Sequence, residues 1–287
     1  MKQVTKLTIE IDRQEIELSI QTEGSGRSIL CLHGLMHSSE IWNRVSELLV
    51  GDFQIITLDL PGFGASPPLT LDRITLSNYG KIVGAAIDML STRHEISAIV
   101  ADSLSTNVIA FACEYGFRPA RTQMLLSGCP FDGIPLLLRV LPVSFFLKPT
   151  LRIFRALPIS WSRPIINLFA RYLVHDWVDS GHEISNGVLQ SDPTTAQKLF
   201  IALKKPTPSR TICALAQHKC ILLRGKFDRI VSRATLCCWA GRINATYLEL
   251  SNSGHTPPIE EPREYAEVIR NLVCQNGAAT AVTRRAD

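Results

Sequence analysis

The chain lacks the features that mark several large classes of protein. No uncharged apolar run approaches the ~18 residues that a membrane-spanning helix requires. Residues 1–12 alternate charged and apolar side chains and contain no apolar core of a secretory signal. Zinc-ligand spacing, a P-loop and a G-x-G-x-x-G opening a helix after a strand are all missing, so we expect no metal or other cofactor. The net charge of +4 over 287 residues is too small to indicate a nucleic-acid partner.

The cysteines also lack the pattern of a disulfide framework. The eight cysteines are scattered through apolar segments. Cys31 and Cys220 fall within strands that we predict to be buried, where a free thiol packs as a small apolar group. A disulfide framework is not expected in a chain of this size without a secretory signal. We therefore predict a reducing, cytoplasmic location.

Ser103 is the most informative residue that is present. An apolar, strand-like run at 98–101 precedes it, and a helix-compatible run at 106–114 follows it. Ala101 and Ser105 are small, as is required where the backbones of a strand and the following helix nearly touch. The segment therefore matches the nucleophile elbow, G-x-S-x-G, with both glycines replaced. A serine that simply caps a helix is the alternative interpretation.

Two later segments supply the acid and the base that a serine nucleophile requires. Residues 220–225 are typical of a buried strand, and Asp228 follows it in a turn. Residues 247–250 form the next predicted strand, and the loop 251–255 ends at His255. Because both residues follow successive strands, we expect them to lie beside Ser103 at one edge of the sheet.

Taken together, these motifs resemble the α/β-hydrolase superfamily between about residues 28 and 275. Four segments around the serine elbow carry the resemblance in the family's order: Leu32-His33-Gly34-Leu35, the D-x-P-G-x-G-x-S loop from Asp59 to Ser66, Gly225-Lys226-Phe227-Asp228, and Gly254-His255 with Glu260 and Pro262.

The resemblance implies a role for each residue of this site. Ser103 is expected to attack a carbonyl carbon, His255 to accept its proton, and Asp228 to hold the imidazole and stabilise its charged form. The backbone N–H groups of Leu35 and Leu104 are expected to form the oxyanion hole.

The order of the predicted elements indicates an α/β fold. Residues 5–10 and 14–20 alternate in polarity and predict an antiparallel hairpin. The later strands alternate with helices, which favours a mostly parallel, doubly wound sheet of about eight strands. We predict a helical lid inserted after the sixth strand, and a disordered tail at 276–287.

The predicted lid, residues 133–208, differs in composition from the predicted core at 1–132 and 209–275. Between 133 and 175 the chain has no acidic residue and six Lys or Arg residues: Arg139, Lys148, Arg152, Arg155, Arg163 and Arg171. The same stretch is rich in large apolar residues, which are either ordinary packing or the wall of a substrate pocket. Our candidates for that wall are His37, Phe145, Phe146, Phe154 and Trp161.

The sequence therefore predicts a serine hydrolase that cleaves an ester or thioester with a hydrophobic acyl part through an acyl-serine intermediate. An acyltransferase or cyclase of lipid or natural-product biosynthesis stays open, as does a non-catalytic ligand-binding protein of the same fold. The basic lid is either a solvated surface or a docking site for an acyl carrier protein, a coenzyme A thioester or an anionic membrane surface.

Alternative assignments exist for the nucleophile and the acid. Asp102 would be the nucleophile in the dehalogenase branch of the family, but Val100 and Leu104 would then stand at the small positions. Asp132 follows another predicted strand and is the alternative acid. We interpret His33 as a structural residue of its loop.

Overall fold

The computed structural model describes most of the chain, in the ranges 2–117, 122–140, 142–171, 174–175 and 181–274. The predicted tail at 276–287 lies outside these ranges. All eight cysteines lie within them and are free thiols. Among the described residues, no helix is both long and apolar enough to cross a membrane.

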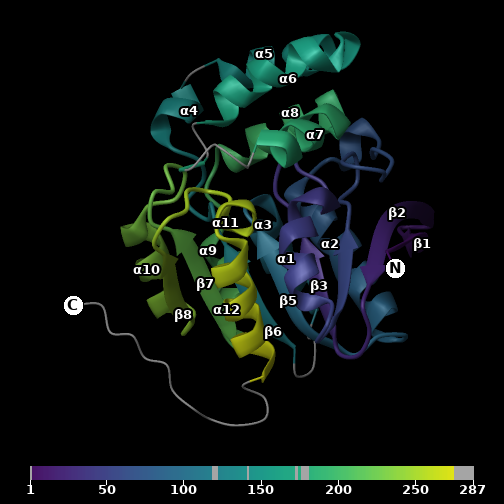
Figure 1. The fold of residues 1–287 in the computed structure, drawn as a ribbon, viewed down its shortest axis with the longest axis vertical. Helices are drawn as coiled ribbons and strands as arrows, with labels where there is room; N and C mark the ends of the chain where they lie inside the picture. Colours follow the sequence, from purple (N-terminus) through teal and green to yellow (C-terminus); the bar gives the residue numbers. More distant parts are fainter. Residues whose placement is uncertain (1, 118–121, 141, 172–173, 176–180, 275–287) are drawn as a thin grey trace.

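The described residues form one eight-stranded sheet at the centre of the molecule (Figure 1), in the spatial order β1-β2-β4-β3-β5-β6-β7-β8. The strands are β1 (Gln3–Ile11), β2 (Gln14–Glu23), β3 (Ser28–Leu32), β4 (Gln54–Leu58), β5 (Ile96–Asp102), β6 (Gln123–Ser127), β7 (Cys220–Gly225) and β8 (Thr246–Leu250). The pairs β1–β2 and β2–β4 are antiparallel, and every other neighbouring pair is parallel. The predicted α/β fold with an N-terminal antiparallel hairpin is confirmed.

The first hairpin turns at two residues with left-handed backbones. Asp12 has φ 52° and Arg13 has φ 60°, the conformation that joins twisted antiparallel strands through a two-residue loop. Leu7 and Ile9 of β1 and Leu18 of β2 are buried. The alternation of polarity along both strands therefore reflects one buried face.

Helices cover both faces of the sheet, as its central strands require. Successive residues of β3 and β5 alternate between two apolar clusters: Ile29 and Val100 belong to one, Leu30 and Ile99 to the other. One face packs against α1 (Asn43–Leu49) and α12 (Pro262–Cys274). The other packs against α2 (Leu76–Ser91), α3 (Leu104–Glu114) and α10 (Arg233–Arg242). The remaining core elements are α9 (Ser209–Cys213), α11 (Pro257–Glu260) and the 3-10 turns η1 (Ser39–Trp42), η2 (Leu71–Arg73) and η3 (Ala214–Gln217).

A helical insert follows β6, where the sequence predicts one. Its helices are α4 (Leu136–Val140), α5 (Val143–Ala156), α6 (Ile159–Ala170), α7 (Gly181–Gln190) and α8 (Pro193–Leu203). Helix α5 contacts α8, α6 contacts α7, and α7 contacts η1 of the core. Figure 1 accordingly shows α5 and α6 as an outer layer, with α7 and α8 between them and the sheet.

Candidate active site

Ser103 is the single residue between the end of β5 and the start of α3. Its φ of 49° and ψ of −112° are rare for a side-chain-bearing residue, and such strain is held by surrounding contacts. The Ser103 N–H donates to the carbonyl of Ser127 at 2.8 Å, and the Thr106 hydroxyl donates to the Ser103 carbonyl at 2.7 Å. The small neighbours Ala101 and Ser105 are completely buried. These features form the predicted strand–turn–helix elbow.

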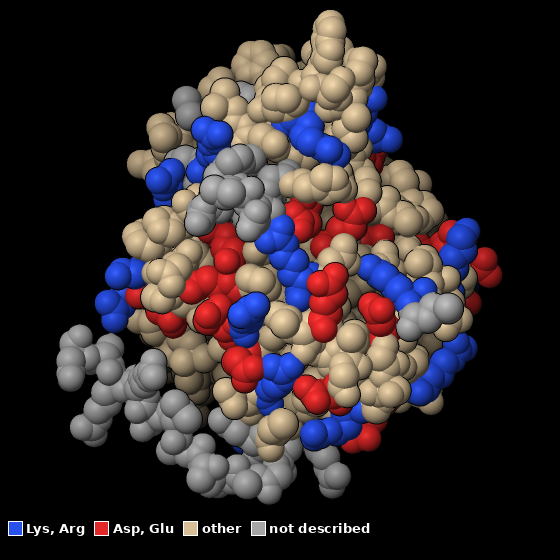
Figure 2. Space-filling view, in the orientation of Figure 1, with Lys and Arg blue, Asp and Glu red and all other residues tan. Residues whose placement is uncertain are grey.

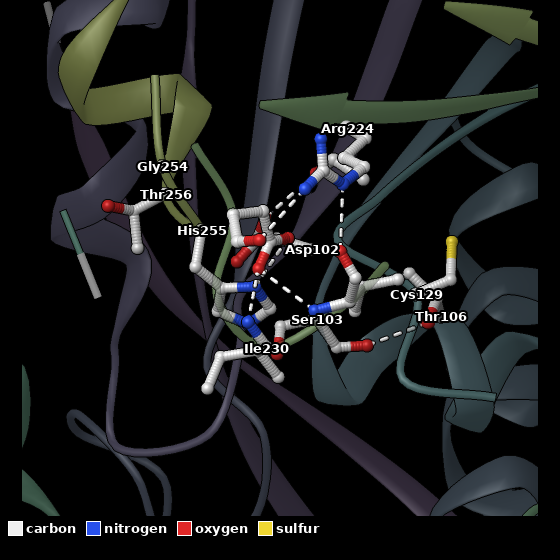
Figure 3. Close-up of polar contacts among 12 residues, drawn as sticks. Asp102, Ser103, Thr106, Cys129, Arg224, Ile230, Gly254, His255 and Thr256 are labelled. Atoms are coloured by element: carbon white, nitrogen blue, oxygen red, sulfur yellow. Dashed lines mark hydrogen bonds and ion pairs between the residues drawn. The ribbon is translucent and has the colours of Figure 1, made fainter. Parts of the chain in front are cut away.

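The structure brings Ser103, His255 and Asp228 together in one hydrogen-bonded series. Ser103 Oγ lies 2.9 Å from His255 Nε2, and both residues are labelled in Figure 3. His255 Nδ1 lies 2.9 Å from Asp228 Oδ2. The other Asp228 oxygen accepts the N–H groups of Ile230 and Val231, at 2.7 and 3.0 Å. The three side chains come from the segments after β5, β8 and β7, so the convergence predicted from the sequence is present.

The loops that carry the acid and the base are themselves held in place. Glu260 accepts the N–H of Gly254 at 3.0 Å and that of Thr256 at 3.2 Å, on either side of His255. Arg224 donates to the backbone carbonyls of Asp228 and Val231, at 2.8 and 2.7 Å. Sequence reasoning found Glu260 through its motif but missed Arg224, because an arginine at the end of a buried strand carries no motif.

Burial and charge act in opposite directions on the paired acid and base. Burial acts to lower the pKa of His255, but the Asp228 carboxylate, with smaller contributions from Asp102 and Glu260, raises the pKa above its usual value. Burial acts to raise the pKa of Asp228, but His255 and two backbone N–H groups lower it. Asp228 is therefore an ionised partner that stabilises a protonated His255.

The segment with the predicted oxyanion donors lies against the elbow. Leu104 is the first residue of α3, so its N–H has no acceptor within that helix. A Cβ added at Gly34 would lie 3.1 Å from Ser103 Cβ and 3.1 Å from Asp102 Oδ2, so any larger residue would require these side chains to shift. Leu35 follows directly and is half-buried. The assignment of the Leu35 and Leu104 N–H groups to an oxyanion hole stays a prediction.

Two histidines of the same segment have different environments. His33 Nδ1–H donates to the Gly34 carbonyl at 2.8 Å, and Nε2 accepts the Leu60 N–H at 3.0 Å, which links two loops and suits a structural role. His37 is 5% exposed, and its Nδ1 has no hydrogen-bond partner within the described ranges. Burial, with His33 and His255 nearby, lowers the pKa of His37 to about 3, so its ring is neutral.

The geometry does not favour the alternative assignments. Asp102 is completely buried and accepts the Ser127 hydroxyl at 2.8 Å, whereas Ser103 occupies the tip of the elbow. Asp132 is exposed and accepts Trp239 Nε1–H at 2.9 Å, so the carboxylate that meets His255 is Asp228. Among the described residues, no group of three or more His, Cys, Asp or Glu is arranged to hold a metal ion.

The structure does not place the aromatic residues of the insert where we expected them. Phe145, Phe146 and Trp161 are 73%, 56% and 67% exposed, on α5 and α6 of the outer layer. Phe154 lines a shallow hollow of about 210 Å³ with Leu157, Ile159 and Leu189 of the insert itself. The apolar residues of the insert gave no indication in the sequence of which side chains point toward the core. Of the five pocket candidates, His37 alone has a described interaction with the site, the electrostatic one with His255.

The sequence analysis did not identify two glycines that lie near the site. A Cβ at Gly128, which has φ 59°, would lie 3.0 Å from His255 Cε1. A Cβ at Gly187 of α7 would lie 2.7 Å from His37 Cα. Gly128 directly follows β6, so its position at the carboxyl end of a strand could have identified it. Gly187 stands inside a helix, where the sequence gives no signal of a close approach.

A family comparison agrees with the fold and with this geometry. The model described as "Alpha/beta hydrolase family" matches residues 29–268, from β3 into α12. The matched range includes Ser103, Asp228 and His255. The chain belongs to the α/β hydrolase family, and is thus of the hydrolase type.

Solved structures share the fold over nearly the whole chain. An esterase from Thermogutta terrifontis superposes with a TM-score of 0.75 at 20% identity, covering 95% of this chain and 98% of that one. An esterase from a Rhodococcus species superposes with a TM-score of 0.73 at 15% identity, covering 96% and 99%. At identities this low, the structural similarity shows a shared fold and nothing more specific.

Curated relatives match over one short stretch only. A pimeloyl-[acyl-carrier protein] methyl ester esterase from Nitrosomonas europaea is 39% identical over 57 residues, which are 20% of this chain and 23% of that protein. A fluoroacetate dehalogenase from a Burkholderia species is 32% identical over 56 residues, which are 20% of this chain and 18% of that protein.

Proposed function

We propose that this protein is a serine esterase that hydrolyses a carboxylic ester with a hydrophobic acyl part. The observation that carries the proposal is the hydrogen-bonded series from Ser103 through His255 to Asp228, with 2.9 Å at each step. The esterases among the similar structures agree with an oxygen ester as substrate. We assign residues 133–208 as a lid, because the insert lies over the edge of the sheet that carries the three residues (Figure 1).

The geometry supports a two-stage reaction. His255 Nε2 takes the proton of Ser103 as its oxygen attacks the ester carbonyl carbon, and the carbonyl oxygen becomes an oxyanion facing the N–H groups of Leu35 and Leu104. The carbon–oxygen bond of the ester then breaks, and the alcohol leaves with the proton from His255. Water attacks the acyl-serine by the same route, which releases the acid and restores Ser103.

The choice of serine chemistry also rests on what stands at the tip of the elbow. In the dehalogenase branch an aspartate takes that position. Here Asp102 directly precedes the serine, and its side chain is completely buried. Ser103 itself reaches His255. The partial similarity to a fluoroacetate dehalogenase therefore carries no halide chemistry over to this chain.

The test uses a fluorophosphonate probe, which labels activated serine hydroxyls, and a series of p-nitrophenyl esters of increasing acyl length. We expect labelling and hydrolysis by the wild-type protein, with longer acyl chains preferred over acetate. Ser103→Ala should abolish both, while Ser209→Ala, at an exposed serine of α9, should change neither. A folded wild-type protein that is neither labelled nor active would refute the proposal.

Product analysis separates the remaining reactions. Mass spectrometry of the products, with and without an added alcohol acceptor, should show the free acid in both cases. Transfer of the acyl group to the acceptor as the main product would instead identify an acyltransferase. Comparison of an ester with the thioester of the same acid gives the preferred leaving group.

A further inference from the structure

The outer helices of the insert expose a concentrated apolar surface. Of the fifteen exposed large hydrophobic side chains among the described residues, ten lie between 136 and 168. They are Leu136, Leu137, Val140, Phe145, Phe146, Ile153, Ile159, Trp161, Ile165 and Leu168. Exposed apolar side chains concentrated in this way mark an interaction site more often than single scattered ones do.

The exposed residues follow the period of a helix, so they form faces rather than scattered points. On α5 the exposed positions include Phe145, Phe146 and Ile153, with Leu151 buried on the opposite side. On α6 they include Trp161, Ile165 and Leu168, at spacings of i, i+4 and i+7. On α4 they include Leu136, Leu137 and Val140. An exposed helix face is ordinarily polar, and here three successive helices turn apolar faces away from the core. We call these exposed positions of α4, α5 and α6 the outer face of the insert.

The charged residues on the helices that carry the outer face are all basic. Residues 133–175 contain six Lys or Arg residues and no Asp or Glu. Arg152 is itself exposed on α5, seven positions after Phe145. In the view of Figure 2, uncharged and basic side chains cover the top of the molecule, where α5 and α6 lie, and most acidic side chains lie below these helices. A partner of this face must therefore offer apolar contact and negative charge together.

We propose that the outer face of the insert docks on an anionic lipid membrane. Phe145, Phe146 and Trp161 would enter the boundary between headgroups and acyl chains, and Arg152 would meet lipid phosphates. These three aromatic side chains are 56–73% exposed and project from the surface. A fluid lipid interface accepts such projections without a matching pocket, whereas a folded protein partner needs one.

A second copy of the chain fits this face poorly. A two-fold dimer joins the same patch of both molecules. It would bring the basic residues of one copy against those of the other, with no acidic residue between 133 and 175 to compensate. Like charges across an interface oppose association, so the charge pattern favours an anionic partner.

The test is vesicle flotation with the full chain. The vesicles are phosphatidylcholine alone, or phosphatidylcholine mixed with phosphatidylglycerol. At about 0.1 M salt we expect the wild-type protein to float with the anionic vesicles, and at about 1 M salt, where the Debye length falls to about 3 Å, we expect binding to decrease. The double variant Phe145→Ser/Trp161→Ser and the single variant Arg152→Glu should each lower the partition coefficient about tenfold or more.

Matched controls distinguish binding through the outer face from nonspecific binding through other exposed residues. Val4→Ser/Leu71→Ser removes two apolar side chains that are 62% and 57% exposed on the core, and Lys219→Glu reverses an exposed charge there. Both controls should bind as the wild type does, and thermal unfolding followed by circular dichroism verifies that every variant is folded. Quenching of Trp161 fluorescence by brominated acyl chains, absent in Trp161→Phe, would show that this side chain enters the lipid.

Several results would overturn the proposal. One is that the folded wild type does not float with anionic vesicles at about 0.1 M salt. A second is that it binds neutral and anionic vesicles equally. A third is that the control variants lose as much binding as the outer-face variants. Sedimentation that shows a dimer abolished by the outer-face variants, without vesicle binding, would assign the face to a second copy. Binding of a purified acyl carrier protein that depends on these residues, again without vesicle binding, would assign it to an acidic protein.

Discussion

Ser105 does more at the elbow than keep its side chain small. The family's motif has glycine at this position, and the sequence alone shows only that serine is a tolerable replacement. In the structure Ser105 is completely buried, and its hydroxyl donates to the backbone carbonyl of His33. Glycine could not make this bond. The serine thus ties the helix behind the nucleophile to the loop that precedes Gly34.

Asp102 provides a test of the electrostatics around His255. Since protonated His255 cannot act as a base, its raised pKa places the acid limb of the kcat/KM profile above pH 6.5, the usual histidine value. Burial raises the pKa of Asp102 to about 6, so this carboxyl is largely ionised at neutral pH and contributes to the raised pKa of His255. Asp102→Asn removes that negative charge, so we expect the acid limb to move to lower pH.

The measurement is the pH dependence of kcat/KM for a soluble ester. Asp72→Asn, at a fully exposed aspartate, is the matched control and should leave the profile in place. An acid limb that stays fixed or moves to higher pH in Asp102→Asn would contradict the electrostatic role.

Gly128 is expected to position the imidazole of His255. In Gly128→Ala the new Cβ would lie 3.0 Å from His255 Cε1, and the backbone at φ 59° would be strained. We expect kcat to fall about 10–100-fold, because small displacements of a catalytic group cost that much. Gly116→Ala is the control, since Gly116 also has a left-handed backbone, at φ 94°, but nothing lies within 4 Å of its added Cβ.

Both variants should lose about 1 kcal/mol of unfolding free energy from the backbone, measured by denaturant titration. Steady-state kinetics should then separate them, because only Gly128→Ala touches the site. Equal kinetics for the two variants would show that Gly128 does not position the imidazole of His255.

At the scale of elements, the sequence predicted the strands well and the faces of the insert poorly. Strands β3 and β5 are apolar on both faces because helices cover both sides, and this pattern is readable from successive residues such as Ile29 and Leu30. Helix α3 begins at Leu104, two residues before the helix-compatible run, because Leu104 and Ser105 pack directly under the elbow. The outward position of Phe145 and Trp161 could not be predicted, since a helix that is apolar on two sides gives no signal of which side meets the core.

Helix α7 provides the contact by which the insert reaches the site, and Gly187 makes the contact close. A Cβ at Gly187 would lie 2.7 Å from both His37 Cα and the Met36 carbonyl oxygen, so Gly187→Ala forces α7 away from the loop that carries Gly34. We expect kcat to fall about tenfold and proteases to cut the insert faster.

The control for this variant is Gly241→Ala. Gly241 also lies inside a helix, and nothing lies within 4 Å of its added Cβ. Both substitutions gain about 0.5–1 kcal/mol of helix propensity, so any difference between them comes from the contact with the core. Kinetics and limited proteolysis of Gly187→Ala that match those of Gly241→Ala would show that the insert does not need this close approach.

At the scale of the whole molecule, the convergence of the site follows from the topology. Parallel strands end at the same edge of the sheet, so Ser103, Asp228 and His255 meet although 152 positions separate the first from the last. This was predictable once the strands were assigned. The supporting contacts of Arg224 and Gly187 depend on how loops and helices pack, and no local pattern reveals them.

The apolar outer face of the insert, surrounded by cations, has a consequence for how the purified protein behaves in solution. At low ionic strength, like charges on the inserts keep molecules apart. Added salt screens that repulsion while leaving the attraction between apolar faces in place. We therefore expect light scattering to report growing self-association as salt rises, and Phe145→Ser/Trp161→Ser to remain monodisperse. Scattering that decreases as salt rises would contradict this expectation. If the protein behaves as predicted, it is best stored at low ionic strength.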